Sequence, residues 1–149
     1  MSSLPIDIVK AVATELNAAE AGTFSESFTA EWKSFVKISL QSGDLDSVKV
    51  SVIPKSRTSA MVTRADSQHD VSIMIGIQKK VGKDREDGVE GMADFVEEII
   101  DYLTGRALAD ATDVRFVSIE NDPIYDSTQL IEDGVFTSIL TIVYMAWRN

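Results

Sequence analysis

The sequence contains no cysteine and only one histidine among its 149 residues. Without cysteine the chain has no disulfide framework, no thiolate nucleophile and no cysteine-ligated zinc, and it is compatible with folding in a reducing cytosol. The one histidine, His69, leaves a nucleophile with a single imidazole base, and a lone histidine at the entrance of a strand is more often an exposed polar residue than a catalyst. The glycines Gly82, Gly88 and Gly91 form neither a GxGxxG motif nor a P-loop. We therefore expect no catalytic residue and no cofactor.

Metal binding would have to rely on carboxylates. The candidates are Asp44 and Asp46 in one turn, and Asp84, Glu86 and Asp87 in a charged connector. Neither stretch has the ligand spacing of a calcium loop or its closing glutamate, so solvated charge is the better interpretation and no metal site is expected. The acidic residues leave open one alternative of another class, a small enzyme or ligand-binding domain that uses paired carboxylates in a concave pocket.

Basic residues are scarce. Fourteen Lys and Arg stand against 24 Asp and Glu, which gives a formal net charge of −10. A protein that holds DNA by its phosphates needs a positive face, so the chain as a whole would repel DNA. The acidic surplus has two interpretations. It keeps the protein soluble, or it lines a surface that DNA passes without adhering.

Long apolar runs are also missing. No run of about 18 apolar residues is present, so no membrane span is predicted. The N-terminal segment carries Asp7, Lys10 and Glu15 and has no small-residue cleavage site, so no signal peptide is expected. The length suits one domain, and no internal repeat or long linker divides the sequence. We therefore expect a single domain over residues 1–149.

Two segments have the apolar spacing of amphipathic helices. The first runs over Leu4–Ala19, with Pro5 at an early helical position and Gly22 as a stop signal. The second runs over Val89–Leu103, and Gly105 stands where a C-terminal stop belongs. These are the two main helices that the sequence predicts.

Alternation of apolar and polar residues predicts the strands. The clearest strand is Val71–Ile77, and Pro54 is expected to end the strand that precedes it. Between them, Lys55–Gln68 is polar and is interpreted as a loop or a weakly paired excursion. The predicted extended segments are Phe24–Leu40, Val48–Val52, Val71–Ile77, Val114–Ile119 and Val135–Trp147. We therefore predict an α+β domain, with a mainly antiparallel sheet of about four to five strands packed with two main helices.

The last predicted strand is apolar on both sides. One side carries Phe136, Leu140, Ile142 and Tyr144, and the other carries Val135, Ile139, Val143, Met145 and Trp147. A sheet with one side in water should alternate apolar with polar residues. Either helices cover both sides of this strand, or another chain closes one of them. With only two helices predicted, burial by a partner is at least as well supported as full internal coverage.

Beyond the first helix, four stretches stand in an order that carries a family resemblance. They are VKVSVIPKS (Val48–Ser56), HDVSIMIGIQKKV (His69–Val81), GMADFVEEIIDYLTGRAL (Gly91–Leu108) and DPIYDSTQLIEDGVFTSILTIVYMAWR (Asp122–Arg148). The last is the most specific, because a Tyr-Asp pair and a polar turn precede Gly-Val-Phe and a strand that ends in an aromatic residue and an arginine. This order resembles the tail terminator, or tail-completion, proteins of long-tailed bacteriophages and their neighbours at the head–tail joint.

The resemblance implies an α+β fold and a structural role in the virion tail or neck, with assembly in the host cytoplasm. Proteins of this family form rings, commonly hexamers, on the last ring of the tail tube, end tube growth and present a surface to the head connector. The implied partners are further copies of the chain, the tail-tube protein and the head–tail connector protein. DNA would pass the channel without specific binding. A head-completion or neck protein between portal and tail is the alternative role.

Five residues are the candidate contacts to a neighbouring subunit or to the tube: Arg57, Arg64, Tyr125, Val135 and Phe136. The two arginines lie in the polar excursion, which would suit a contact arm because a guanidinium pairs well with carboxylates. A solvated loop is the other interpretation of that segment. Phe136 likewise has two interpretations, in the subunit's own core or against a neighbour.

Overall fold

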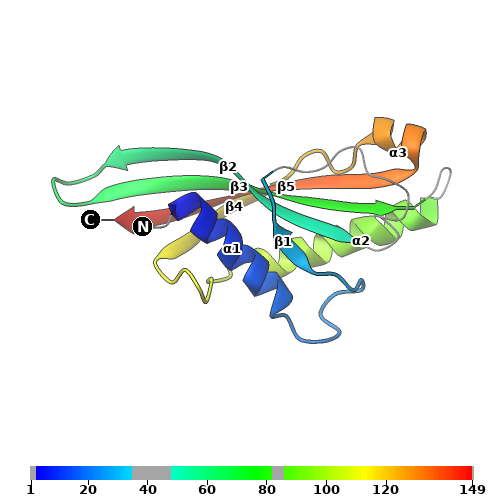
Figure 1. Ribbon diagram of the computed structural model, residues 1–149, viewed down its shortest axis with the longest axis horizontal. Helices are drawn as coiled ribbons and strands as arrows, with labels where there is room; N and C mark the ends of the chain where they lie inside the picture. Colours follow the sequence, from blue (N-terminus) through cyan, green and yellow to red (C-terminus); the bar gives the residue numbers. More distant parts are fainter. Residues whose placement is uncertain (1–2, 35–47, 82–85, 149) are drawn as a thin grey trace.

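The computed structural model describes residues 3–34, 48–81 and 86–148, which form three helices and one sheet (Figure 1). The elements are α1 (Leu4–Asn17), β1 (Ala30–Trp32), β2 (Lys49–Met61), β3 (Ser67–Lys80), α2 (Glu86–Leu103), β4 (Val114–Asn121), α3 (Ser127–Asp133) and β5 (Val135–Arg148). The predictions for residues 35–47 and 82–85 lie outside the described residues. They include the turn at Gly43 and the acidic candidates Asp44, Asp46 and Asp84.

The five strands form one mixed sheet in the order β1-β2-β3-β5-β4. The short β1 runs parallel to β2, and the other neighbouring strands are antiparallel. The predicted strand Val71–Ile77 lies within β3, at the centre of the sheet, where β2 and β5 flank it. The predicted α+β class, with a mainly antiparallel sheet and two main helices, is confirmed.

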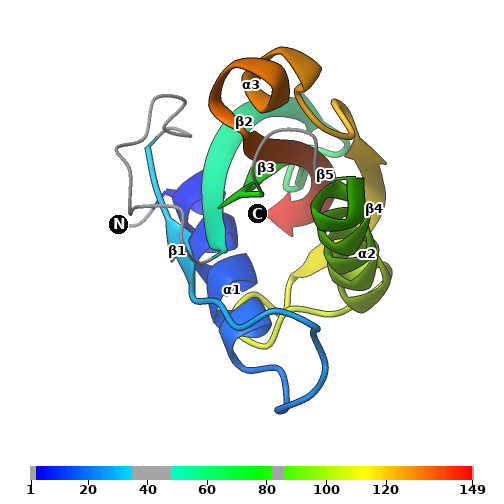
Figure 2. The same ribbon diagram turned by 90° about the vertical axis from the view of Figure 1, so that its right-hand side faces the viewer.

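The two long helices cover one side of the sheet. Helix α1 packs against β1, β2 and β3, and α2 lies beside β5 and β4, as the end-on view of Figure 2 shows. The short α3 lies on the opposite side of the sheet and contacts β5 near the start of that strand (Figure 1). Among the helices of the described residues, only α3 lies on the side without α1 and α2, at one end of it.

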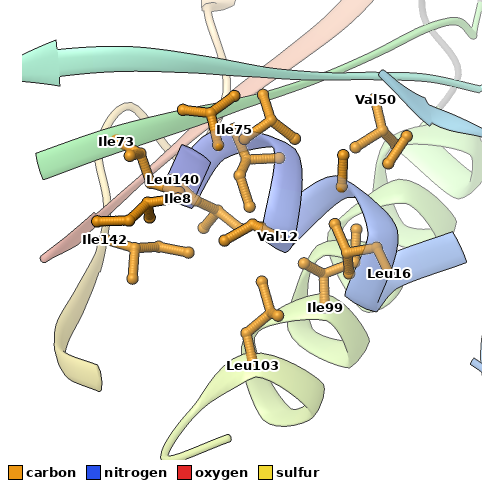
Figure 3. Packing of buried hydrophobic residues seen from close by; sticks show 14 of the residues in the cluster. Ile8, Val12, Leu16, Val50, Ile73, Ile75, Ile99, Leu103, Leu140 and Ile142 are labelled. Atoms are coloured by element: carbon orange, nitrogen blue, oxygen red, sulfur yellow. The ribbon is translucent and has the colours of Figure 1, made fainter. Parts of the chain in front are cut away.

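A single apolar cluster fills the space between the sheet and the two long helices. Helix α1 contributes one continuous stripe, and the side chains of α2 meet it over the sheet (Figure 3). The residues labelled in that view are Ile8, Val12, Leu16, Val50, Ile73, Ile75, Ile99, Leu103, Leu140 and Ile142. All ten are buried. Burying one such side chain stabilises a fold by about 1.5–3 kcal/mol, so this cluster is the main source of stability.

Helix α1 ends at Asn17, two residues before the predicted end at Ala19. The Asn17 side chain receives a hydrogen bond from the Ala30 N–H (2.7 Å) and donates one to the Ala30 carbonyl (2.9 Å). The amide thus pairs with both backbone groups of the first residue of β1, as a neighbouring strand would. This contact positions β1 beside the end of the helix.

The prediction that Pro54 ends its strand is wrong, because β2 continues to Met61. Proline removes a backbone donor, and for that reason it is found in sheets at edges and bulges. The β2–β3 register shifts between Pro54 and Ser56, which places Pro54 at such a bulge. Most of Lys55–Gln68, interpreted above as a loop or a weakly paired excursion, is consequently part of the sheet, and only the segment between Met61 and Ser67 turns. The start of β3 pairs there with β2 on one edge and with the end of β5 on the other.

Helix α3 was not predicted from the sequence. Its seven residues are too few for an apolar stripe to be recognised by periodicity. It ends at Gly134, which has a φ of 67° and donates its N–H to the Leu130 carbonyl (3.0 Å). Glycine adopts this left-handed conformation without the strain that a β-carbon brings, so Gly134 allows the chain to pass directly from α3 into β5.

Candidate subunit interface

The β2–β3 hairpin extends past the helices as an arm. We use "arm" for residues 55–70, which form the far left end of the molecule in Figure 1, beyond the start of α1. Residues 55–65 are all exposed. The sheet face that α1 covers further along the hairpin therefore continues onto the arm without a helix over it.

The bulge at Pro54 decides which arm residues lie on the helix side of the sheet. Directly paired residues share a side, and Val71, which pairs with Arg57, is completely buried beneath the helix layer. Arg57 therefore projects on the helix side, together with Ser59 and Met61. Without the extra residue of the bulge, strict alternation would have placed Arg57 on the opposite side.

Arg57, Ser59 and His69 form a hydrogen-bonded group on this side of the arm. The Arg57 Nη2 lies 3.0 Å from His69 Nδ1, the Ser59 Oγ lies 2.7 Å from the same nitrogen, and Arg57 Nε donates to Ser59 Oγ (3.2 Å). Since guanidinium groups only donate, Nδ1 is the acceptor and the proton of a neutral His69 resides on Nε2. The group holds the guanidinium in one orientation at an otherwise open surface.

The turn of the arm is short and presents apolar and cationic side chains. The Thr63 Oγ1 accepts hydrogen bonds from the N–H groups of Ala65 (3.2 Å) and Asp66 (3.0 Å), which closes the turn locally. Arg64 at the turn is exposed. Met61, at 77% exposure, and Val62, at 50%, are among the most exposed apolar residues described. Exposed apolar side chains beside arginine are the composition found in protein interfaces.

The final strand supplies a second surface. Its helix side, Phe136 to Ala146 at every second residue, is buried. On its other side, Ile139, Val143 and Met145 are only partly covered and Trp147 is 46% exposed. Met74 of β3 is also partly covered, and it pairs with Thr141 of β5, next to Ile139 and Val143. We call Met74, Ile139, Val143, Met145 and Trp147 the open face. The structure thus shows that the protomer's two long helices cover one side of β5, and leave apolar residues at the surface of the other.

Three of the five predicted contact residues lie away from the arm. Tyr125 follows β4 and is 40% exposed, and its ring lies 5.9 Å from that of Phe136. Phe136 is completely buried in the helix-side core, and Val135 is also buried. Of the two interpretations of Phe136, the structure supports the core. Val135 and Phe136 are corrected from interface residues to packing residues of the protomer, whereas Arg57, Arg64 and Tyr125 remain accessible.

Acidic side chains of the described residues all reach solvent, since the buried polar residues are Ser51, Gln78, Thr137 and Ser138. A carboxylate with a raised proton affinity for acid–base work needs burial or a like-charged neighbour. In the described ranges no three His, Asp or Glu side chains gather as metal ligands. The carboxylate-based alternative stays a prediction.

The solvent side of α2 is uniformly acidic. Glu90, Asp94, Glu97 and Asp101 are exposed and recur at spacings of four, three and four residues, which aligns them along one side of the helix. We call them the acidic stripe. No Lys or Arg occurs in α2. Like charges at these spacings destabilise a helix by about 0.2–0.5 kcal/mol per pair, so the stripe carries a cost that packing alone does not explain.

No protein-family model matches the chain, and no curated protein is similar to it at a significant level. Among the described residues, no helix is both long and apolar enough to cross a membrane.

Proposed function

We propose that the chain is a structural subunit that forms a ring with further copies of itself at the head-proximal end of a phage tail tube. In this role it ends tube growth and joins the tail to the head connector, and it turns over no substrate. The observation that supports self-association is the open face of β5. The order of sequence motifs, which resembles that of tail terminator proteins, supports the place in the virion.

The open face favours association because its apolar residues are contiguous. Ile139, Val143 and Met145 lie on one side of one strand, with Thr141 between the first two, and Met74, which pairs with Thr141, extends the patch onto β3. Burying apolar surface contributes roughly 25 cal/mol per Å², and contiguous apolar patches on soluble proteins mark interaction sites. A second copy or the tail-tube protein would remove these side chains from water.

The acidic composition fits the same role. A ring around a DNA channel benefits from negative charge, since like charge keeps phosphates from adhering to the wall. The chain carries 24 acidic residues against 14 basic ones. DNA is accordingly a passing molecule and not a ligand in this proposal.

Light scattering coupled to size-exclusion chromatography, with negative-stain imaging, tests the ring. We expect a closed oligomer, a hexamer by the family resemblance, with a central hole. The protein should be measured alone and with the tail-tube protein of the same phage, because a ring can require the tube as template. A strict monomer under both conditions, at high concentration, would contradict the proposal.

The place in the virion needs a separate measurement. A tail terminator should stop the growth of purified tail tubes and remain at one end of them, which electron microscopy of tubes grown with and without the protein detects. A neck or head-completion protein should instead bind the connector and leave tube length unchanged.

A further inference from the structure

We infer that the arm of one copy docks, on its helix side, against the acidic stripe on α2 of the next copy. The inference rests on the self-association proposed above and specifies which two surfaces meet. The occupant of the bare arm surface is thus a second copy of this chain. The observations that carry it are the uncovered sheet face of the arm, the charges on both surfaces and their positions in the molecule.

The helix side of the arm is a sheet face that no helix of the protomer covers in the described structure. Along the body of the sheet, the helix side of β2 and β3 is covered by α1. On the arm the same side continues without a helix and carries Arg57, Ser59, Met61 and His69. A sheet face that is helix-covered along most of its length has a surface shape suited to another helix. Met61 is apolar and exposed, so removing it from water would favour this contact.

The arm and the acidic stripe differ in charge. The cations of the arm are Lys55, Arg57 and Arg64, and all three are exposed. The acids of the arm lie elsewhere, since Asp70 pairs with Thr58 on the opposite side and Asp66 lies in the turn. On the helix side the register therefore places the cation Arg57 and no acid of the arm, although the chain as a whole is strongly acidic. The acidic stripe is opposite in sign to Arg57.

Neither the arm nor the acidic stripe forms an ion pair within the described parts of the protomer. The ion pairs there join Lys33 to Glu31, Lys79 to Glu26, Arg106 to Glu15 and Arg148 to Asp113. None of them involves a cation of the arm or an acid of the stripe. Arg57 bonds to Ser59 and His69, neither of which is an anion, so its positive charge stays uncompensated there.

The arm and the acidic stripe lie apart along the long axis of the protomer. The arm forms one end of the long axis of the molecule, and α2 begins at the opposite end (Figure 1). One protomer cannot bring them together, but neighbours arranged head to tail can. A contact between two different patches is heterologous, and such contacts generate closed rings when the rotation between neighbours closes. The inferred contact thus has the symmetry that a ring requires.

Charge reversal in the full-length chain tests this pairing. The arm variant carries Arg57→Glu and Arg64→Glu, and the stripe variant carries Glu90→Lys, Asp94→Lys, Glu97→Lys and Asp101→Lys. Each variant alone places like charges against each other, so we expect self-association to weaken by about a hundredfold or more. A matched control, Lys10→Glu with Lys80→Glu, reverses two exposed cations outside the arm and should assemble as the parent does.

Mixing the two variants gives the decisive measurement. In an equal mixture, the negative arm of one variant meets the positive stripe of the other, and the positive arm of the second meets the negative stripe of the first. We expect rings of alternating variants to form again, and a chain that carries all six substitutions to assemble alone. Circular dichroism of each variant verifies the fold.

The possible failures separate the two proposals. If the parent assembles and the arm variant assembles as well as the control does, the pairing is wrong and the ring stands. If both variants fail alone and neither the mixture nor the combined chain recovers, the two surfaces do not meet. If the parent chain never assembles, with or without tail-tube protein, the proposed function itself is contradicted.

Discussion

Arg57 and His69 lie on opposite strands of the arm, and the guanidinium donates a hydrogen bond to the imidazole Nδ1 at 3.0 Å. The pairing joins the single histidine of the chain to an arginine that forms no ion pair within the described residues. Its consequence is preorganisation, because a long side chain that is already held loses less freedom when a partner binds. The histidine therefore acts through the arginine that it positions.

Replacing His69 with alanine should leave the fold almost unchanged and weaken assembly. The site is at the surface, so we expect the free energy of unfolding to change by no more than about 0.5 kcal/mol. Self-association should fall by about two- to tenfold, because Arg57 then has to be ordered on binding. Thermal melts and sedimentation measure the two effects. Thr58→Ala, on the opposite side of the arm, is the control, and an equal loss of assembly in that variant would exclude a specific role for His69.

Introducing a charge on the open face should prevent assembly without unfolding the protomer. Val143 is partly exposed at the centre of that face, and Val143→Asp would force a carboxylate into an apolar contact. Light scattering should show smaller species, while circular dichroism retains the parent spectrum. Ile131→Asp, at a 71% exposed position on α3, is the matched control and should assemble normally. An intact ring in Val143→Asp would show that the open face is not a subunit contact.

Truncating Phe136 should destabilise the protomer itself. The aromatic side chain of Phe136 is completely buried and packs beside Tyr125 at the start of β5. Removing a buried aromatic ring leaves a cavity, and Phe136→Ala should lower the free energy of unfolding by about 3–5 kcal/mol. Denaturant titration measures this loss. If Phe136→Ala keeps the parent's stability and loses only the oligomeric assembly, Phe136 is an interface residue after all.

Tyr144 should make the protein sensitive to alkaline pH. Burial, with a smaller contribution from the charge of Glu15, raises the pKa of the Tyr144 hydroxyl above its ordinary value of about 10. The folded state then keeps its proton where the unfolded state has lost it. The free energy of unfolding is therefore unaffected below the unfolded pKa and falls as the pH rises above it.

The same hydroxyl is buried without a hydrogen-bond partner in the described structure. Tyr144→Phe should remove that unsatisfied group, increase the free energy of unfolding near neutral pH by about 1 kcal/mol, and flatten the alkaline loss. Thermal melts between neutral and strongly alkaline pH provide the test. Tyr125→Phe is the control, since that side chain is exposed and should leave the alkaline slope as it is. A steeper slope in Tyr144→Phe than in the parent would contradict the assignment.

Two glycines should respond oppositely to alanine. Gly134 has a positive φ of 67°, so Gly134→Ala strains the junction between α3 and β5 and should cost about 1 kcal/mol. Gly91 lies inside α2, where a β-carbon would meet nothing within 4 Å. Gly91→Ala should stabilise by about 0.5–1 kcal/mol because alanine favours the helix. Denaturant midpoints of the two variants, compared with the parent, measure both signs.

Local periodicity determined most of the elements. The alternation at Val71–Ile77 and the stripe at Val89–Leu103 depend on side-chain spacing alone, and both segments lie within elements of the predicted type. The end of the second helix near Gly105 was also predicted from the sequence, and the φ of 72° at Gly105 is one that glycine adopts without strain. Such features are local, because they depend on one residue or one repeat.

Tertiary structure decided what no local pattern contains. The position of β1 beside α1 depends on Asn17 meeting Ala30, thirteen residues later. The side on which Arg57 projects depends on a bulge opposite β3, and the burial of Phe136 depends on which helices cross β5. Each of these is a contact between distant segments, whose free energy exists only after the chain has folded. The sequence by itself therefore determined the kind of most elements and the apolar surplus of the last strand. The packing decided how far β2 extends, where α3 forms and which of those apolar residues remain at the surface.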